Sequence, residues 1–512
     1  GYYTTNNSKT DYNTLDAQRL IKASWDASGP DAHWRDRPKG SPFFAVFNLM
    51  TSHQSRSMVW PYEKFQSEVQ SRLTPLQIHD PQKIRLPPYY PDSNLIRRDW
   101  ARFYDCVTAM DAEVGAILNQ LRADGLDDNT IVFFYSDHGS GMPRHKRVLL
   151  DSGMHVPMII RTPRPWQTLL QGLPGTSSGQ LISFVDLPPT VLQLTAQQKP
   201  EWMQGHSFCA GNEARAFAFG HRDRVDEAID CARSVRDSRF LYIRNFMPHI
   251  SHHQPTAWPD QGQIRGELSR LTDQQAMTTA QWYYVAPARP REELYDCAAD
   301  PDNLRNLVDS PGHRNHLTRL RDALHAHLKT TQDLGFVPEV ELAEKRGRIS
   351  ANDQADSLDD AWSMFDGDAT ELTTEELTWW KLQSLFLRDR LDQPSETVVR
   401  AVMEQSSRRT IPLTIVAADW LVRTERDPSA MNHLIELTRH DDLNIVLQAM
   451  RAIELLGDDA RSAVPAVKEL SKRCTAIQSP STTATFELTP DQDLAMFISF
   501  SAGAFLKRQS EE

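Results

Sequence analysis

Three short apolar runs, with a long amphipathic segment between the first two, restrict the fold more than any other feature of the sequence. The runs occupy residues 43–50, 130–135 and 156–160. Continuous apolar runs of this length are typical of strands that are buried on both faces. The segment between the first two repeats an apolar residue every three or four positions, which predicts a helix that ends at Asp124 and Gly125. The stripe consists of Trp100, Phe103, Val107, Met110, Val114, Ile117 and Leu121. Strands that alternate with a helix predict an α/β fold with a mostly parallel sheet.

The pattern changes after about residue 215. Residues 217–220 and 236–246 are typical of strands in a smaller antiparallel sheet, and residues 312–329 predict a polar helix. The stretch that follows is charged, rich in Asp and poor in large apolar residues, which is typical of a linker. The sequence therefore predicts an α/β domain (1–215), a smaller subdomain (216–335), a linker (336–372) and an all-α domain (373–512).

The all-α domain contains an internal repeat. Ile415, Ala418 and Leu421 are echoed about 31 residues later by Val446, Ala449 and Ala452. Small and aliphatic residues at helical spacing with such a period are typical of stacked helix pairs, and this part resembles HEAT repeats. An ordinary helical bundle is the alternative. The repeats would serve either to dock a protein partner or to shield the neighbouring domain.

Composition excludes several classes of function. The formal net charge of -12 argues against nucleic-acid binding, because the phosphate backbone demands a basic face. No apolar run reaches the roughly 18 residues that a membrane-spanning helix needs. The five cysteines are scattered without a C-x-x-C pair, which argues against a thiolate zinc site.

Polar clusters follow the predicted strands. Asp137 and His138 come directly after the strand at 130–135, and His53 lies just beyond the run at 43–50. Ligands of open α/β sheets gather beyond the carboxyl ends of the strands. A carboxylate at such a position can serve a hard cation such as Ca²⁺. Lys9 and Lys146 carry the positive charge that a sulfate or phosphate group requires, although surface lysines are common.

The order of these clusters resembles the sulfatase family. The segment from Gly1 to Lys9 is similar to the family's Gly-Tyr-x-Thr segment and its lysine, and the run at 43–50 with Thr51-Ser52-His53 is similar to the strand that delivers an active-site histidine. Ser136-Asp137-His138-Gly139, Lys146 and Ser152-Gly153 resemble the second half of the family's metal site and the lysine that follows it. The family also has a motif near the C-terminal end of its catalytic unit. This motif is matched by Glu293-Leu294-Tyr295-Asp296, Asp300-Pro301 and Asn306-Leu307. The resemblance covers about residues 1–330.

This resemblance implies an alkaline-phosphatase-like sulfatase sandwich and a calcium-dependent sulfuric-ester hydrolase. Carried over position by position, Asp137 and His138 would bind one calcium ion. Lys9 and Lys146 would hold the sulfate oxygens, and His53 would protonate the leaving alcohol or donate a hydrogen bond to it. The family's nucleophile is a formylglycine made from a Cys or Ser in a C/S-x-P/A-x-R motif.

Two parts of the family's pattern are missing from the sequence. None of the five cysteines stands in the nucleophile motif, and the Asp-Asp pair that forms the other half of the metal site is absent. Both normally precede the segment with which this chain begins. We therefore expect a catalytic domain that lacks its N-terminal part, an inactive fragment as it stands, and a full-length parent that is periplasmic or secreted.

Two alternatives to a sulfatase of sulfated carbohydrates remain at this stage. One is a phosphodiesterase or phosphonate hydrolase of the same superfamily, and the other is a non-catalytic sulfatase-like scaffold whose helical repeats bind a partner. Four further residues near the predicted loops are candidates for substrate contact, with packing as their competing role. They are Arg56, Tyr89, Tyr90 and His145.

Overall fold

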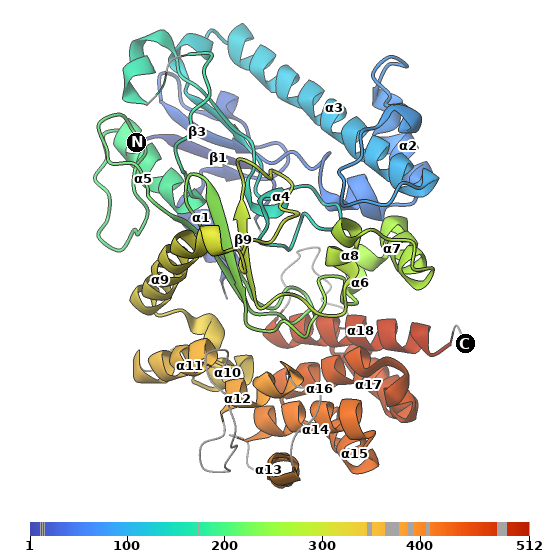
Figure 1. Cartoon of the computed structure of the whole chain (residues 1–512). Helices are drawn as coiled ribbons and strands as arrows, with labels where there is room; N and C mark the ends of the chain where they lie inside the picture. Colours follow the sequence, from blue (N-terminus) through green and yellow to red (C-terminus); the bar gives the residue numbers. More distant parts are fainter. Residues whose placement is uncertain are drawn as a thin grey trace.

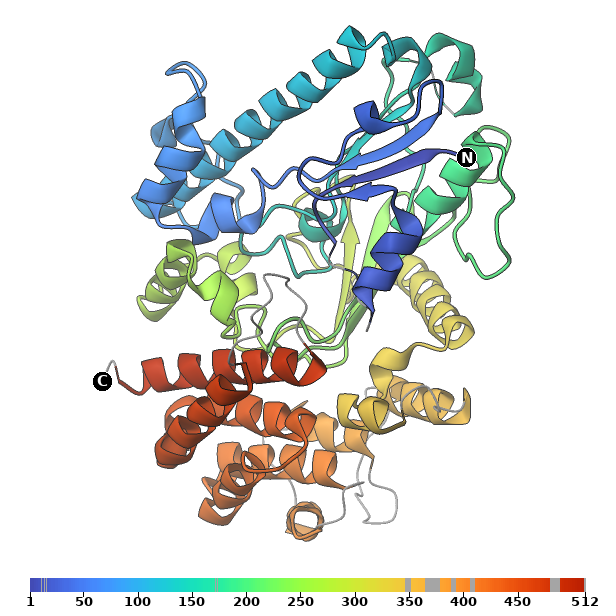
Figure 2. The ribbon, with the colours of Figure 1, turned by 180° about the vertical axis from the view of Figure 1, so that it is seen from behind.

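The computed structural model has a mixed α/β part and an all-helical part, which lies below it in Figure 1 and is seen from behind in Figure 2. The structure describes the 512-residue chain apart from short gaps. These gaps are residues 11, 13, 15, 171, 173, 346–350, 364–377, 388–392, 406–409, 479–488 and 511–512. Among the described residues, no helix combines the length and the apolar character needed to cross a membrane.

The first sheet is parallel and has three strands. They are β1 (Tyr3–Asn7), β2 (Ala27–Ser28) and β3 (Phe43–Phe47), in the order β2-β1-β3. Asn7 of β1 lies opposite Phe47 of β3, so both strands end at the same edge. The chain segments that carry Lys9 and His53 therefore leave the sheet side by side.

The second pair of strands corrects the prediction of a mostly parallel sheet. β4 (Val132–Tyr135) and β5 (Met158–Arg161) are antiparallel and form a separate two-stranded sheet. The chain between them contains only the one-turn helix α4 (Asp151–Met154) and returns to the end of β4 that it left. A parallel pair needs a crossover to the opposite end of the strand, so this connection enforces antiparallel pairing.

The prediction that these apolar strands are buried on both faces was also wrong. Phe44, Tyr135 and Ile159 are exposed by 38%, 43% and 63%. The 3₁₀ turn Trp34–Asp36 covers one face of β1 and β3, where the Trp34 ring stacks against Phe43. An apolar run can therefore form a strand with one covered face, which periodicity alone does not distinguish from a strand covered on both.

The predicted amphipathic helix is α3 (Asn94–Ala123), which runs along the upper edge of the molecule in Figure 1. The side chain of Ser93 caps its first turn by accepting a hydrogen bond from the backbone N–H of Ile96, at 3.3 Å. Gly125 follows its C-terminus with a φ of +68°, in the left-handed region that favours glycine at this position. Shorter helices complete the α/β part. They are α1 (Ala17–Ser24), α2 (Tyr62–Glu68), α5 (Leu187–Leu194), α6 (Ala257–Asp260), α7 (Gln263–Asp273) and α8 (Thr279–Val285).

The predicted antiparallel sheet is confirmed and has four strands in sequence order. They are β6 (Ala218–Arg222), β7 (Ala232–Arg236), β8 (Phe240–Asn245) and β9 (Glu292–Asp296). The predicted run at 236–246 thus contains the turn between β7 and β8 as well as β8 itself. The predicted polar helix is α9 (Arg314–Thr331), which packs on β7 and β8 through Leu317, Leu320, Leu324 and Leu328.

The segment expected to be a linker is structured where it is described. It contains α10 (Glu339–Lys345) and α11 (Ala351–Ser363), whereas residues 346–350 and 364–372 lie outside the described residues. Leu358 and Ala361 of α11 are buried in the same core as the antiparallel sheet. Trp362 of the same helix also packs against this core, so a few apolar side chains hold a segment that is otherwise charged.

The last part of the chain is helical, as its composition predicts. Its helices are α12 (Trp379–Gln383), α13 (Gln393–Met403), α14 (Ile411–Glu425), α15 (Pro428–Leu437), α16 (Leu443–Leu456), α17 (Val464–Gln478) and α18 (Pro490–Arg508). The repeated residues fall on α14 and α16, and all six side chains are buried in one core. Helices α14, α16 and α18 pack on one another in succession (Figure 1).

A buried arginine joins the helical part to the α/β part. Arg451 of α16 donates hydrogen bonds to Gln254 Oε1 and to the carbonyl oxygen of Pro255, both at 2.7 Å. Its Nη1 also lies 2.5 Å from Glu454 Oε2, and both side chains of this ion pair are fully buried. Burial raises the pKa of Glu454, although Arg451 and Ser501 oppose this shift. The buried guanidinium of Arg451 therefore pairs with a carboxylate of its own helix and also bonds to the α/β part.

Replacement of Arg451 by alanine should strongly destabilise the protein. The variant would leave Glu454 buried without its cation, so the free energy of unfolding should fall by about 3–5 kcal/mol in urea denaturation. Arg270→Ala is the control, because the Arg270 side chain, which pairs with Glu267, is half-exposed, and the substitution should cause a much smaller change. Equal effects of the two substitutions would contradict the structural role of Arg451.

Candidate active site

The structure brings Lys9, His53, Asp137, His138 and Lys146 together at the ends of three strands. Lys9 Nζ lies 3.9 Å from Asp137 Oδ2, and His138 Nε2 lies 3.6 Å from the same oxygen. The charges of Lys9, Lys146 and Asp137 all act on His53. The five predicted side chains thus form one cluster, whereas their catalytic and metal-binding roles stay predictions.

His53 is held as a neutral hydrogen-bond donor. Its Nδ1 accepts a hydrogen bond from the backbone N–H of Ser55 at 3.3 Å, and the Ser55 hydroxyl lies 2.8 Å from the same nitrogen. Because a backbone N–H only donates, Nδ1 carries no proton, and the neutral ring carries its proton on Nε2. Burial, followed by the charges of Lys146 and Lys9, lowers the pKa of His53 to about 4. At neutral pH this ring can donate from Nε2 but carries no positive charge.

Lys146 lies in a tight loop that concentrates positive charge. Its backbone N–H donates to the carbonyl oxygen of Ser140 at 3.0 Å, and its neighbours Arg144 and Arg147 both have left-handed backbones, with φ of +63° and +76°. Burial and the charge of Arg147 lower the pKa of Lys146 to about 8, against the opposing effect of Asp137. An ammonium group with these surroundings gains more from a bound anion than an exposed lysine does.

Close backbone contacts fix the loop that carries Asp137 and His138. The N–H of Gly139 donates to the carbonyl oxygen of Gly153 at 2.9 Å. A Cβ atom on Gly139 would lie 1.9 Å from the carbonyl oxygen of Ser152, and one on Gly153 would lie 2.3 Å from that of Val148. Only glycine fits at these two positions, which explains their place in the sequence pattern.

The motif near residue 300 supports the same loop from the far side. The guanidinium of Arg144 donates to the carbonyl oxygens of Asp302 and Asn303 at 3.0 and 2.9 Å. The Asn303 side chain accepts from the backbone N–H of Asp151 at 3.0 Å. These contacts anchor both ends of the segment that contains Lys146, so the motif has a structural role.

Asp137 and His138 have the arrangement of two metal ligands but not the number that calcium needs. His138 Nδ1 lies 2.6 Å from the carbonyl oxygen of Gly139 and donates to it, which leaves the lone pair of Nε2 on the side of Asp137. Burial is the main cause that lowers the pKa of His138, and a low pKa favours the neutral form that binds metals. Within the described part of the chain, no third His, Cys, Asp or Glu joins them. Calcium takes six to eight oxygen ligands, so these two residues alone do not hold it.

The sequence did not reveal several residues that support the cluster. Ser55 sets the protonation of His53, and the short spacing of the two residues was the only available signal. Arg147 bridges Gln54 Oε1 and Asp226 Oδ2, each at 3.0 Å. Asp226 comes from the antiparallel subdomain, far along the chain, and no local pattern predicts such a partner.

The four residues proposed for substrate contact divide into two groups. Tyr89 and Tyr90 are buried in the core, where the Tyr89 hydroxyl lies 3.0 Å from His145 Nε2 and the Tyr90 hydroxyl donates to the carbonyl oxygen of Pro143. Burial lowers the pKa of His145 to about 3, so its ring is neutral. These three residues pack the base of the loop, whereas Arg56 lies beside His53 and lines a pocket.

None of the five cysteines is presented as a nucleophile. All are buried and free of disulfides. Burial raises the pKa of the Cys106 and Cys297 thiols to about 12, and it also raises the pKa of the Cys231 and Cys474 thiols. Buried thiols with raised pKa values are unreactive.

The fold is mixed α/β, with one parallel sheet and two antiparallel sheets. Residues 4–197 match the sulfatase family model, so this part of the chain is similar to sulfatases.

Three relatives illustrate the similarity. The chain is 38% identical over 373 residues to an ulvan-active sulfatase of Formosa agariphila, which covers 67% of this chain and 60% of that protein. It is 28% identical over 271 residues to the human N-sulphoglucosamine sulphohydrolase, covering 48% of this chain and 51% of that enzyme. It is 34% identical over 162 residues to an endo-4-O-sulfatase of Bacteroides thetaiotaomicron, covering 30% of this chain and 28% of that enzyme. The chain thus spans less than two thirds of each of these proteins, namely 60%, 51% and 28% of their lengths.

The pKa of Lys146 predicts how anion binding depends on pH. Its ammonium group loses a proton as the pH rises through about 8, so the affinity for inorganic sulfate should fall about tenfold between pH 7 and pH 9. Isothermal titration calorimetry across this range measures the change. Lys146→Arg should flatten the profile, because a guanidinium stays charged. A parallel fall in both proteins would exclude Lys146 as the titrating group.

Proposed function

We propose that this cluster binds the sulfate group of a sulfuric ester and that the protein acts as a sulfatase. The observation that supports the proposal most strongly is the convergence of Lys9, Lys146 and the Nε2–H of His53 on one site at the strand ends. Two ammonium groups and one neutral donor suit a tetrahedral oxyanion, because charge-assisted hydrogen bonds to such groups are strong.

In this proposal the two lysines bind the sulfate group, and His53 acts on the leaving alcohol. Lys9 and Lys146 bind the non-bridging oxygens. His53 donates a hydrogen bond to the bridging oxygen of the ester, and this bond strengthens as negative charge builds on the leaving alcohol. A bound sulfate ester would itself raise the pKa of His53, which brings the ring closer to acting as a proton donor. No residue of this chain is assigned as the nucleophile.

We include a calcium ion in the proposal, but this chain provides only two of its ligands. Asp137 Oδ2 and His138 Nε2 would supply two of its ligands, and the ion would add positive charge beside the sulfate. Lys9 lies beside Asp137 and partly offsets the negative charge of this carboxylate.

A sulfated carbohydrate is the proposed substrate class. The names of the three relatives refer to ulvan, to N-sulphoglucosamine and to an endo-acting 4-O-sulfatase. We infer the same class for this chain from its similarity to these proteins, over the shares of their lengths given above.

The test is turnover by the protein expressed from its natural reading frame. We expect faster release of 4-nitrophenol from 4-nitrophenyl sulfate than from bis(4-nitrophenyl) phosphate. Lys146→Ala should lower kcat/KM for the sulfate at least tenfold, since a hydrogen bond to a charged group contributes about 1.5–3 kcal/mol. Lys39→Ala is the matched control, because Lys39 is exposed, and it should leave the rate unchanged.

The opposite preference would remove the sulfatase assignment. Faster turnover of the phosphate diester would favour a phosphodiesterase. Binding of sulfate esters without any turnover would favour a non-catalytic scaffold.

A further inference from the structure

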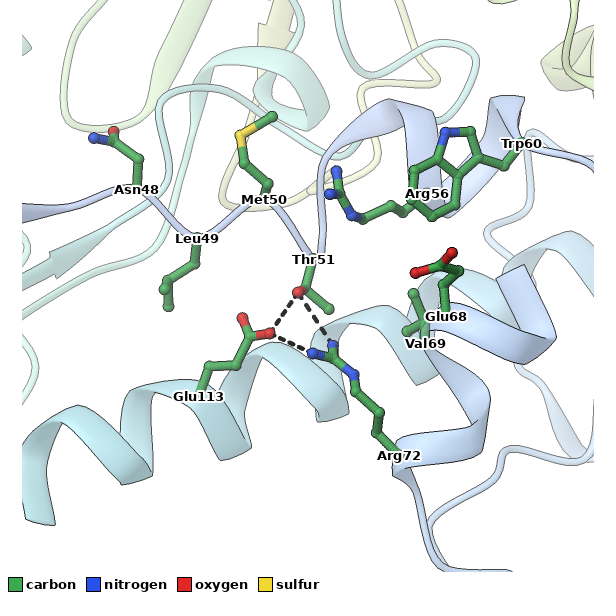
Figure 3. Close-up of a pocket in the computed structure, with 10 residues that line it drawn as sticks. All are labelled: Asn48, Leu49, Met50, Thr51, Arg56, Trp60, Glu68, Val69, Arg72 and Glu113. Carbon is green, nitrogen blue, oxygen red and sulfur yellow. Dashed lines mark hydrogen bonds and ion pairs between the residues drawn. The ribbon is translucent and has the colours of Figure 1, made fainter. Parts of the chain in front are cut away.

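A pocket lies beside His53 and is separate from the five clustered side chains. It has a volume of about 350 Å³ and opens between the loop that follows β3 and the helices α2 and α3 (Figure 3). Such a volume falls in the range of small-ligand sites. The pocket contains Thr51 and Arg56, which flank His53 in the chain, so it adjoins the proposed sulfate site.

Arg56 is positioned on the upper wall of this pocket, next to Trp60 (Figure 3). The carbon between its guanidinium nitrogens lies 4.7 Å from the centre of the Trp60 ring, a cation–π distance. Its Nη1 contacts the Ser55 hydroxyl at 3.4 Å, and this hydroxyl in turn contacts His53. In the described ranges, no carboxylate lies within ion-pair distance of Arg56, so its planar fork of donors is available to a ligand.

The lower wall is a fixed polar network. The Thr51 hydroxyl and Arg72 Nη1 both donate to Glu113 Oε1 at 2.7 Å, and Arg72 Nη2 contacts the Thr51 hydroxyl at 3.2 Å (Figure 3). Because each of these side chains has a partner within the network, the wall is set before a ligand arrives. It presents donors and acceptors together, as the hydroxyl groups of a sugar require.

The charges of the pocket distinguish Arg56 from the other charged groups that line it. Arg72 and Glu113 form an ion pair, whereas Glu68 is exposed at the rim and Arg56 is half-buried. The four groups sum to zero, so the pocket does not attract anions by its net charge. Among the described charged groups of the lining, Arg56 is half-buried and has no ion-pair partner, so a carboxylate beside it would receive two parallel hydrogen bonds.

We propose that this pocket binds the sugar that neighbours the sulfated one, and that this sugar is a uronate whose carboxylate pairs with Arg56. The inference rests on the proposed function for its orientation, because the sulfate group would occupy the site at His53. Trp60 fixes Arg56 and forms an apolar wall for the sugar ring, while Thr51, Arg72 and Glu113 meet its hydroxyl groups.

The test compares four ligands by isothermal titration calorimetry. They are a disaccharide of a uronate linked to a sulfated hexose, the same disaccharide with its uronate reduced to the neutral sugar, its desulfated form, and the sulfated hexose alone. We expect the complete disaccharide to bind at least tenfold more tightly than the reduced one. Arg56→Ala should erase this difference and leave the dissociation constant of the sulfated hexose within about twofold.

Two further variants test whether the planar guanidinium of Arg56 causes the preference for the uronate. Arg56→Lys should restore only part of the preference, since an ammonium group does not offer a planar fork. Arg122→Ala, on an exposed part of α3, is the matched control and should change nothing. If Arg56→Ala fails to fold, the comparison of the complete and reduced disaccharides on the unmodified protein still decides.

Several outcomes would overturn the proposal. Equal binding of the complete and reduced disaccharides by the unmodified protein would exclude a uronate at Arg56. A loss of affinity for the sulfated hexose as large as that for the disaccharide would mean that Arg56 acts through His53. Equal binding of sulfated and desulfated disaccharides would instead refute the proposed sulfate site and leave the uronate site standing. Failure of all four ligands to bind would refute both.

Discussion

The repulsion between Lys9 and Lys146 is the constraint on which the architecture of the site depends. Both ammonium groups act on the same histidine, whose pKa falls to about 4 as a result of burial and of these two charges. In the described cluster, the carboxylate that most directly offsets them is that of Asp137, which lies 3.9 Å from Lys9. A protein holds two like charges together at a cost in stability, and a bound oxyanion recovers that cost. The site is therefore prepared for an anion before one arrives.

Strand pairing, hydrogen bonds and ion pairs from the rest of the molecule hold these charged side chains in place. Parallel pairing of β1 and β3 directs Lys9 and His53 to one edge of the sheet. Glycines at 139 and 153 allow the backbone contacts that fix Asp137 and His138, and Arg144 and Asn303 anchor the loop of Lys146. Asp226 binds Arg147, the neighbour of Lys146, and so ties the antiparallel subdomain to the cluster. The helical part is joined to the same subdomain region through the buried contacts of Arg451.

The sequence predicted features that depend on neighbouring residues. It did not predict features that depend on contacts between residues far apart in the chain. His53, Asp137 and His138 follow predicted strands, so their convergence could be inferred from the carboxyl ends of those strands, whereas Lys9 and Lys146 were placed only by the family resemblance. The pairing direction of β5 depends on where its connecting loop returns, which an apolar run does not encode. The packing of α11 depends on Leu358 and Ala361 within a charged segment, so composition alone was misleading. Asp226 and the walls of the pocket beside His53 come from separate elements, and no spacing along the chain brings them together.

The pKa of His53 measures the central claim most directly, because it reports the two lysines, the burial of the ring and any bound anion at once. Ring resonances of His53, assigned with a His53→Gln variant, can be followed by NMR as the pH changes. We expect a pKa of about 4 for His53 in the protein alone, a higher value in the presence of inorganic sulfate, and a rise also on Lys146→Ala. An ordinary pKa near 6.5 that neither sulfate nor the substitution changes would contradict it.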